Sequence, residues 1–258
     1  MVEASESLLG EPAPAANHRL AYGPDPQQFG DLWLPPGPGP HPLVIALHGG
    51  FWRAKHDLAH FGHLCAAAAE AGLATWSLEY RRVGNGGGCP TTLEDVRSGA
   101  AFALSLAARF PLELSRVALL GHSAGGQLAL WLAARPPLAL RGVVALAPVS
   151  DLLRASALRL GDGITDEFLG GTPETVPARY AEASPRARLP LGCRQVLLHG
   201  RDDRTVPFAL SADYVAAALA AGDEARLVAC EGAGHFELID PRTPEGQESL
   251  RALLELTA

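Results

Sequence analysis

Ser123 lies between Gly121 and Gly125 in the run LLGHSAGGQLALW, where an apolar segment passes into a helical pattern. A serine in a tight strand-to-helix turn exposes its hydroxyl, provided that glycines two residues away leave room for the backbone. In such a turn the next N–H groups point toward whatever the hydroxyl attacks. The spacing therefore predicts a nucleophilic serine, and the competing interpretation is that Ser123 only caps the helix.

A serine hydroxyl needs a base and an orienting acid before it can attack a carbonyl group. When the serine follows a central parallel strand, the acid comes next along the chain and the histidine last. The run RQVLLHGRDDRTVP ends a predicted strand with two aspartates, of which Asp203 is the predicted acid and Asp202 the expected turn cap. His235, in GAGHFELIDP, is the one histidine beyond them and is therefore the predicted base.

A second glycine-rich turn, LHGGFWR, ends another apolar run. Adjacent glycines let the backbone turn its N–H groups outward, as the negatively charged oxygen of an acyl-transfer intermediate requires. The predicted donors to this oxyanion are the N–H groups of Gly50, Phe51 and Ala124. His48 is expected to hold the turn through hydrogen bonds. The competing interpretation is a plain glycine turn.

Apolar side chains near these turns predict where a substrate would bind. We expect Trp52, Leu152, Leu153 and Phe168 to wall a compact apolar acyl or aryl pocket. Packing of the two aromatic rings in the core is an equally good interpretation.

Short apolar runs alternate with longer helical patterns along most of the chain. Because these runs are continuous, they predict parallel strands buried on both faces. The expected fold is α/β, with a mostly parallel central sheet, an antiparallel N-terminal hairpin and helices on both faces. The strands are expected in NHRLAY, QQFGDLWLP, LVIALH, LATWSLEY, RVALLGH, RGVVALAP, RQVLLHG and ARLVAC.

The length of 258 residues suits one large domain. Residues 1–16 are rich in Glu, Ser, Pro and Ala and predict a flexible tail, which leaves 17–258 as the domain. Residues about 151–190 interrupt the strand–helix alternation with short amphipathic pieces. They predict a small helical lid over the end of the sheet, or else a surface excursion without a role in binding.

Composition narrows the classes of partner. A net charge of −7 without a basic stripe argues against nucleic acid. No apolar run is long enough for a membrane span, and the first residues lack the basic start of a signal peptide. Four scattered cysteines show no metal-ligand spacing, so neither a metal nor a cofactor is expected, and the predicted location is the cytoplasm. The sequence gives no indication of the oligomeric state.

Taken in order, HGGFW, LEYRRVGNGGG, GHSAGGQLALW, HGRDDRTVP and GAGHFELIDP resemble the α/β-hydrolase superfamily. More narrowly, the chain is similar to esterases, kynurenine formamidase-like and prolyl-oligopeptidase-like hydrolases that share an H-G-G-x-W segment. The resemblance implies Ser123 as nucleophile, His235 as base and then acid, and Asp203 as the orienting carboxylate. Phe51 replaces the glycine of hormone-sensitive-lipase-like esterases, and GNGGGCP lacks the Trp expected of formamidase-like relatives.

These observations together predict a carboxylesterase-like serine hydrolase that cleaves a small carboxylic ester through an acyl-enzyme. An arylformamidase is the main alternative, followed by a small peptidase and by a hydrolase-fold protein that binds a small molecule without converting it. A small-molecule ester or amide is the expected partner.

Overall fold

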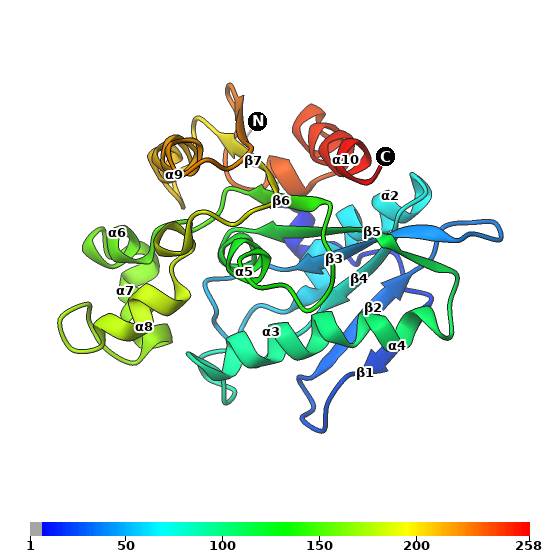
Figure 1. Ribbon diagram of the computed structural model, residues 1–258, viewed down its shortest axis with the longest axis horizontal. Coiled ribbons are helices and arrows are strands. Elements are labelled where there is room, and N and C mark those ends of the chain that lie inside the picture. Colours follow the sequence, from blue (N-terminus) through cyan, green and yellow to red (C-terminus); the bar gives the residue numbers. More distant parts are fainter. Residues whose placement is uncertain (1–6) are drawn as a thin grey trace.

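A single mixed sheet organises the molecule (Figure 1). The computed structural model describes residues 7–258, and within them eight strands form the sheet in the order β1-β2-β4-β3-β5-β6-β7-β8. The strands are β1 (His18–Ala21), β2 (Phe29–Trp33), β3 (His41–Leu47), β4 (Ala74–Leu78), β5 (Leu112–His122), β6 (Gly142–Leu146), β7 (Arg194–Gly200) and β8 (Ala225–Cys230).

The strand directions confirm the predicted α/β-hydrolase architecture. β1 pairs with β2 as an antiparallel hairpin, and β2 runs antiparallel to β4. From β4 to β8 every neighbouring pair is parallel. The carboxyl ends of the parallel strands therefore meet at one edge, where loops lead into helices and ligands bind in folds of this kind.

Helices cover both faces of the sheet and create two cores. Along β3, Leu43 and Ile45 point into one buried cluster while Val44 and Ala46 point into the other, as strand geometry requires. The first core includes residues of α3 (Thr91–Ala101), α4 (Ala103–Ala107), α5 (Ala124–Ala133) and α9 (Phe208–Ala220), and the second includes residues of α2 (Gly62–Glu70) and α10 (Pro244–Thr257). The continuous apolar strands are thus buried on both sides, except the edge strand β8, which is largely half-exposed.

Short helices occupy the stretch between β6 and β7, at one end of the sheet (Figure 1). Asp151 begins the first of them by accepting a hydrogen bond from the Arg154 N–H. Whether this stretch acts as a lid stays a prediction. The helices are α6 (Leu152–Ala157), α7 (Leu160–Leu169), α8 (Pro177–Ala183) and the 3₁₀ helix η3 (Pro185–Arg188).

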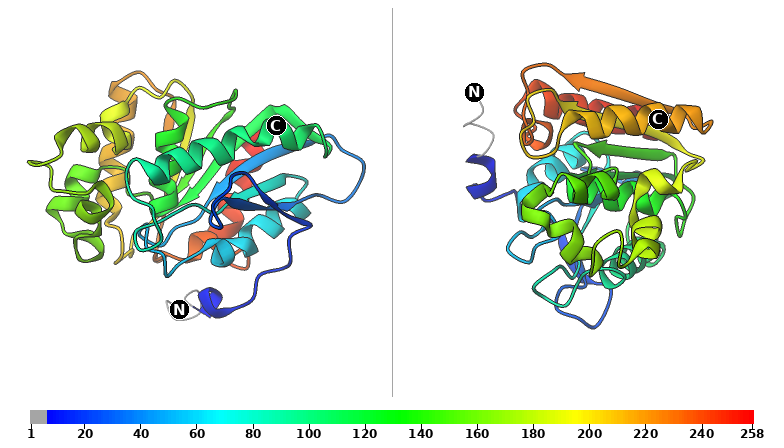
Figure 2. Two further views of the ribbon diagram at one scale, coloured as in Figure 1. Left: turned by 90° about the horizontal axis from the view of Figure 1, so that it is seen from below. Right: turned by 90° about the vertical axis from the view of Figure 1, so that its left-hand side faces the viewer.

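That residues 1–16 form a flexible tail stays a prediction, and the described part of this segment makes contacts with the domain. Residues 1–6 lie outside the described residues, but η1 (Ser7–Gly10) and the extended chain after it pack on the domain (Figure 2). The Leu8 side chain is 0% exposed in the second core, and the Trp33 indole N–H donates to the Pro14 carbonyl. The average composition of the segment gives no sign of the buried Leu8. Burial of this side chain offsets the entropy that the segment loses when it packs on the domain.

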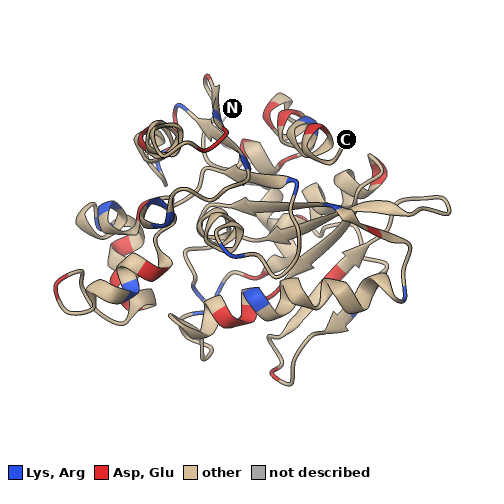
Figure 3. Ribbon diagram, viewed as in Figure 1, with Lys and Arg blue, Asp and Glu red and all other residues tan. Residues whose placement is uncertain are grey.

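Charged residues lie mostly on helices and loops around the sheet, with both signs on α3 and α10, while the central strands are largely uncharged (Figure 3). Within residues 7–258, no helix combines the length and the hydrophobicity that crossing a lipid bilayer demands.

Candidate active site

Ser123 sits in a strained turn between β5 and α5. Its φ of 56° and ψ of −119° lie outside the regions that ordinary residues favour. The flanking glycines are required by contact, because a Cβ at Gly121 would lie 2.2 Å from the Gly125 carbonyl oxygen. A Cβ at Gly125 would lie 2.1 Å from the carbonyl oxygen of Leu47 on β3. The glycine spacing therefore reflects how closely the strand, the turn and the helix approach one another.

Backbone hydrogen bonds hold this turn in place. The Ser123 N–H donates to the Leu146 carbonyl at 2.8 Å, and the Ser123 carbonyl accepts from the N–H groups of Gln127 and Val149. Although Ser123 occupies the position before α5, its side chain makes no capping hydrogen bond. The capping interpretation therefore does not account for the hydroxyl.

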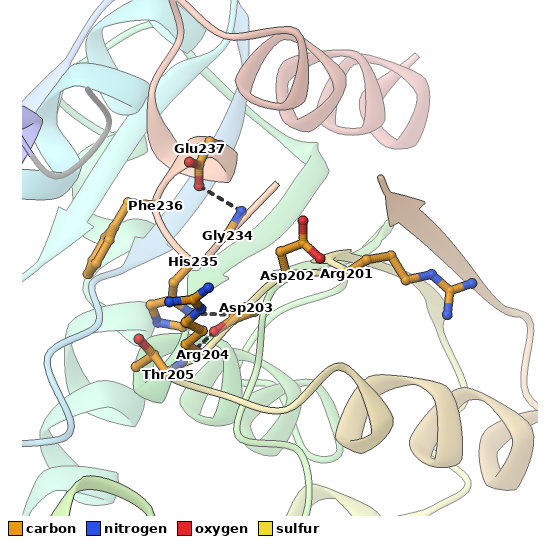
Figure 4. Close-up of a pocket in the computed structure, with 9 residues that line it drawn as sticks. All are labelled: Arg201, Asp202, Asp203, Arg204, Thr205, Gly234, His235, Phe236 and Glu237. Carbon is orange, nitrogen blue, oxygen red and sulfur yellow. Dashed lines mark hydrogen bonds and ion pairs between the residues drawn. The ribbon is translucent and has the colours of Figure 1, made fainter. Parts of the chain in front are cut away.

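His235 is hydrogen-bonded to Asp203 through Nδ1 and Oδ2 at 2.6 Å (Figure 4). The two side chains come from the loops after β8 and β7, and both help line an open cavity of about 600 Å³. The Asp203 Oδ1 atom accepts from the N–H groups of Thr205 and Val206. Asp203 itself thus caps the turn that Asp202 was expected to cap, while Asp202 is exposed.

Asp203 is held in its ionised form. Burial alone would raise the pKa of this carboxyl, but hydrogen bonds from His199 and His235, with the Val206 N–H, outweigh burial and hold the pKa well below its usual range. His199 contributes through Nε2, which lies 3.2 Å from Asp203 Oδ2. A buried negative charge beside Nδ1 favours protonation of that nitrogen and leaves Nε2 of His235 to accept a proton.

His122, the residue before Ser123, joins the serine turn to the His235 loop. Its Nε2 lies 3.0 Å from the His235 carbonyl oxygen, which can only accept, so we assign the proton to Nε2. Burial, followed by the charges of His235 and His60, lowers the pKa of His122 well below its usual value, and the ring is neutral. Neither His122 nor His199 was singled out from the sequence. The available signal was their place, immediately before the serine and four residues before Asp203.

The oxyanion turn has an unusual backbone. Gly50, Phe51 and Trp52 have φ values of 109°, 50° and 53°, all in the left-handed region. Gly50 and Phe51 line a cavity together with Ser123, and Ala124 begins α5 directly after the serine. The predicted donors thus lie on two segments that flank Ser123, and their role as donors stays a prediction.

His48 holds that turn from behind. Its Nδ1 lies 2.8 Å from the Gly49 carbonyl oxygen and its Nε2 lies 3.1 Å from Glu79 Oε1. Both partners are hydrogen-bond acceptors, so each ring nitrogen of His48 is engaged by one of them. The Tyr80 hydroxyl donates to the His48 carbonyl, and Arg82 pairs with Glu79. Through these contacts His48 holds the turn, as the sequence predicted.

The cavity that contains both Ser123 and His235 is small, about 160 Å³. The sequence predicted Gly50, Phe51 and His235 near the serine but did not single out a leucine, three histidines, a threonine and a phenylalanine that also line the cavity. The lining residues are Leu9, Gly50, Phe51, His56, His60, His122, Ser123, Thr205, His235 and Phe236.

The four residues predicted to wall the substrate pocket do not line this cavity. Trp52 and Phe168 stack at 4.5 Å between ring centroids in the first core, and the Trp52 indole N–H donates to Gln127. Leu152 is buried in the same core, whereas Leu153 is 51% exposed. Because consecutive residues have left-handed φ values, the Trp52 side chain, which follows Phe51, turns into the core. The packing interpretation of the aromatic rings is therefore the right one.

Among the residues that the structure describes, no three or more His, Cys, Asp or Glu side chains group in a way that could hold a metal ion.

Comparisons with known proteins give a family and named relatives. A family model described as BD-FAE matches residues 31–217. The probable isoprenylcysteine alpha-carbonyl methylesterase ICME of Oryza sativa subsp. japonica is 26% identical over 244 residues, which are 85% of this chain and 58% of that protein. Esterase LipC of Mycobacterium tuberculosis is 26% identical over 246 residues, 86% of this chain and 60% of LipC. The chain thus spans between about half and three fifths of these curated relatives.

Solved structures share the fold. Esterase B from Lactobacillus rhamnosis superposes with a TM-score of 0.82 at 19% identity, over 99% of this chain and 91% of that chain. The propionate-bound esterase Est2 of Thermogutta terrifontis gives a TM-score of 0.76 at 23% identity, over 94% and 93% of the two chains.

Proposed function

Because the chain belongs to the BD-FAE family, we propose that it hydrolyses small carboxylic esters with Ser123, His235 and Asp203 as its catalytic residues. The observation that carries the proposal is the cavity shared by Ser123 and His235, with His235 hydrogen-bonded to a buried ionised carboxylate. Further support comes from the relatives, which include a probable methylesterase and an esterase.

The reaction proceeds in two halves. Oγ of Ser123 attacks the ester carbonyl carbon while Nε2 of His235 takes the hydroxyl proton, and the carbonyl oxygen becomes an oxyanion. The C–O bond to the leaving group then breaks, and His235 returns the proton to the departing alcohol. Water, deprotonated by His235, attacks the acyl-enzyme, and breaking the Ser123 ester bond releases the acid.

The surrounding groups stabilise charge as it develops. The N–H groups of Phe51 and Ala124, with Gly50 as a third donor, stabilise the oxyanion, and each is expected to contribute about 10²- to 10³-fold in rate. Asp203 keeps the proton on Nδ1 of His235 and stabilises the imidazolium that forms during attack. His48 acts only through the turn, since both of its ring nitrogens are engaged.

The substrate class follows from the cavity. Its volume of about 160 Å³ is below the range of about 300–1,000 Å³ usual for pockets that enclose drug-sized ligands. Its large apolar side chains favour an uncharged acyl group. An ester of a short-chain acid therefore fits better than a peptide.

The test is hydrolysis of p-nitrophenyl acetate by the wild-type protein, Ser123→Ala and the control Ser115→Ala. Ser115 is exposed on β5 and lies outside the cavity lining. Wild type and Ser115→Ala should hydrolyse the ester equally, while Ser123→Ala should lose nearly all activity. Equal rates for wild type and Ser123→Ala would overturn the proposal.

Two further measurements sharpen the result. Intact-mass spectrometry after reaction with a fluorophosphonate should show one covalent adduct, on Ser123, and none on Ser123→Ala. N-formylkynurenine separates the arylformamidase alternative, because a higher kcat/KM on that amide than on every ester would contradict ester hydrolysis as the main activity.

A further inference from the structure

The two leucines of η1 lie in contrasting environments. Leu8 is 0% exposed and belongs to the second core together with Phe61. Leu9 is 42% exposed, and it lines the cavity that contains Ser123 and His235. One leucine therefore anchors the segment, and its neighbour contributes apolar surface to the cavity.

Contacts beyond the leucines fix the segment on two sides. On one side, Nε2 of His63, on α2, lies 3.2 Å from the Glu11 carbonyl oxygen. On the other, the Glu11 carboxylate pairs at 2.9 Å with Arg242, which follows the His235 loop and also binds Asp240. The position of Leu9 is thus tied to the loop that carries His235.

Farther along the segment, the chain lies close against α2. A Cβ at Gly62 would lie 2.7 Å from the Ala13 Cβ. Together with the bond from the Trp33 indole N–H to the Pro14 carbonyl, this contact holds the segment along its length. Leu9 is therefore presented on a fixed piece of chain.

Leu9 is one of three large apolar side chains around the cavity, with Phe51 and Phe236. Two histidines beside them, His56 and His60, are held in their neutral form near neutral pH. Burial, reinforced by His48 and His56, lowers the pKa of His60 to about 3. Burial, with Lys55 and His48, also lowers the pKa of His56. An uncharged acyl chain is therefore the group that this lining suits.

We propose that Leu9 is a specificity-determining residue that closes the cavity to longer acyl chains. The inference rests on the proposed ester hydrolysis and adds the residue that limits the length of the acyl chain. Replacing the isobutyl side chain by a methyl group opens room along this wall. Each methylene of substrate that becomes newly buried should raise kcat/KM by about fourfold.

The experiment compares acyl-chain profiles on p-nitrophenyl acetate, butyrate, hexanoate and octanoate. The proteins are full-length wild type, Leu9→Ala, Leu9→Trp and the control Leu254→Ala, whose leucine is 40% exposed on α10. Each readout is a ratio of kcat/KM values within one protein, so the amount of folded enzyme cancels.

Leu9→Ala should raise the hexanoate-to-acetate ratio by about 15-fold, as expected if roughly two methylenes become buried. Leu9→Trp should lower the butyrate-to-acetate ratio, and Leu254→Ala should leave the profile unchanged. A wild-type profile in Leu9→Ala, measured with an active wild type, overturns the role of Leu9 alone. Failure of the wild type to hydrolyse any of the four esters overturns the proposed function itself.

Discussion

Two of the histidine–carboxylate pairs lie near the same cavity, and they differ in how many ring nitrogens are engaged. In one, only Nδ1 of His235 is engaged, by Asp203, and the side chain lines the cavity with Ser123. In the other, both ring nitrogens of His48 are engaged, by the Gly49 carbonyl oxygen and by the Glu79 carboxylate. His48 is 0% exposed and stacks on Tyr80 at 4.4 Å between ring centroids.

The difference shows that a histidine beside a carboxylate does not by itself indicate proton transfer. A ring whose two nitrogens are both hydrogen-bonded within the protein has neither nitrogen free for a substrate, and its role is to hold its neighbours in place. A ring bonded through one nitrogen is oriented and still able to react. We therefore expect variants of the first pair to lower the rate and variants of the second to lower the stability.

His235→Gln should give the largest effect. Without an imidazole at this position the Ser123 hydroxyl has no base, so kcat on p-nitrophenyl acetate should fall by about 10⁶-fold. The thermal unfolding midpoint should stay near that of the wild type, because only one side-chain hydrogen bond is lost. Substantial activity in the variant would remove His235 from the proposed mechanism.

Asp203→Asn should follow, with kcat lower by about 10⁴-fold, because the amide no longer selects the productive tautomer of His235. Steady-state kinetics on the same ester measures the loss. Asp202→Asn is the matched control, since that side chain is exposed, and it should behave as wild type. A similar loss in both variants would mean that Asp203 has no special relation to His235.

Glu79→Gln should affect the stability of the protein more than its rate of hydrolysis. Removing this carboxylate leaves the buried guanidinium of Arg82 without its charged partner and weakens the hydrogen bond to His48, which should cost about 3–5 kcal/mol in the free energy of unfolding. Activity per folded molecule should fall by no more than about 10²-fold, through a less rigid oxyanion turn. Urea unfolding and active-site titration separate the two effects. A rate loss as large as that of Asp203→Asn, with unchanged stability, would break the comparison.

The smallest effect concerns pH and His60. Its pKa of about 3 in the folded protein lies below the ordinary 6.5, so between these values the unfolded chain binds more protons than the folded one. Stability should therefore fall as the pH is lowered from 6.5 toward 3, by up to about 1.4 kcal/mol per pH unit for this group.

His60→Phe should make that slope shallower without removing it, because the pKa of His122 is lowered by burial in the same direction. Urea unfolding between about pH 4 and 6.5 measures the slope, in a window above the ordinary pKa of aspartate. Asp203 contributes separately, since its lowered pKa supplies stability that is lost only as the pH falls below about 3.9. An unchanged slope in His60→Phe would exclude His60 as a source of the acid sensitivity.

The sequence by itself determined the sheet, the helices and the positions of three candidate catalytic residues. Continuous apolar runs predict buried strands because strand burial depends on local composition, and all eight runs became strands. Gly121 and Gly125 mark the serine turn because close approach of two backbones excludes any Cβ there. In this fold the chain order of serine, aspartate and histidine follows from the topology.

Only the tertiary structure decided which side chains surround the serine. Phe51 and Trp52 both have left-handed φ values, so the Phe51 ring lies at the cavity and the Trp52 ring lies in the core. No periodicity in the sequence predicts this arrangement. Leu9 lies at the cavity because its neighbour Leu8 is buried in the second core. The composition of this segment by itself would predict disorder. Local patterns report burial and backbone shape, whereas the walls of a cavity depend on contacts between segments far apart in the chain.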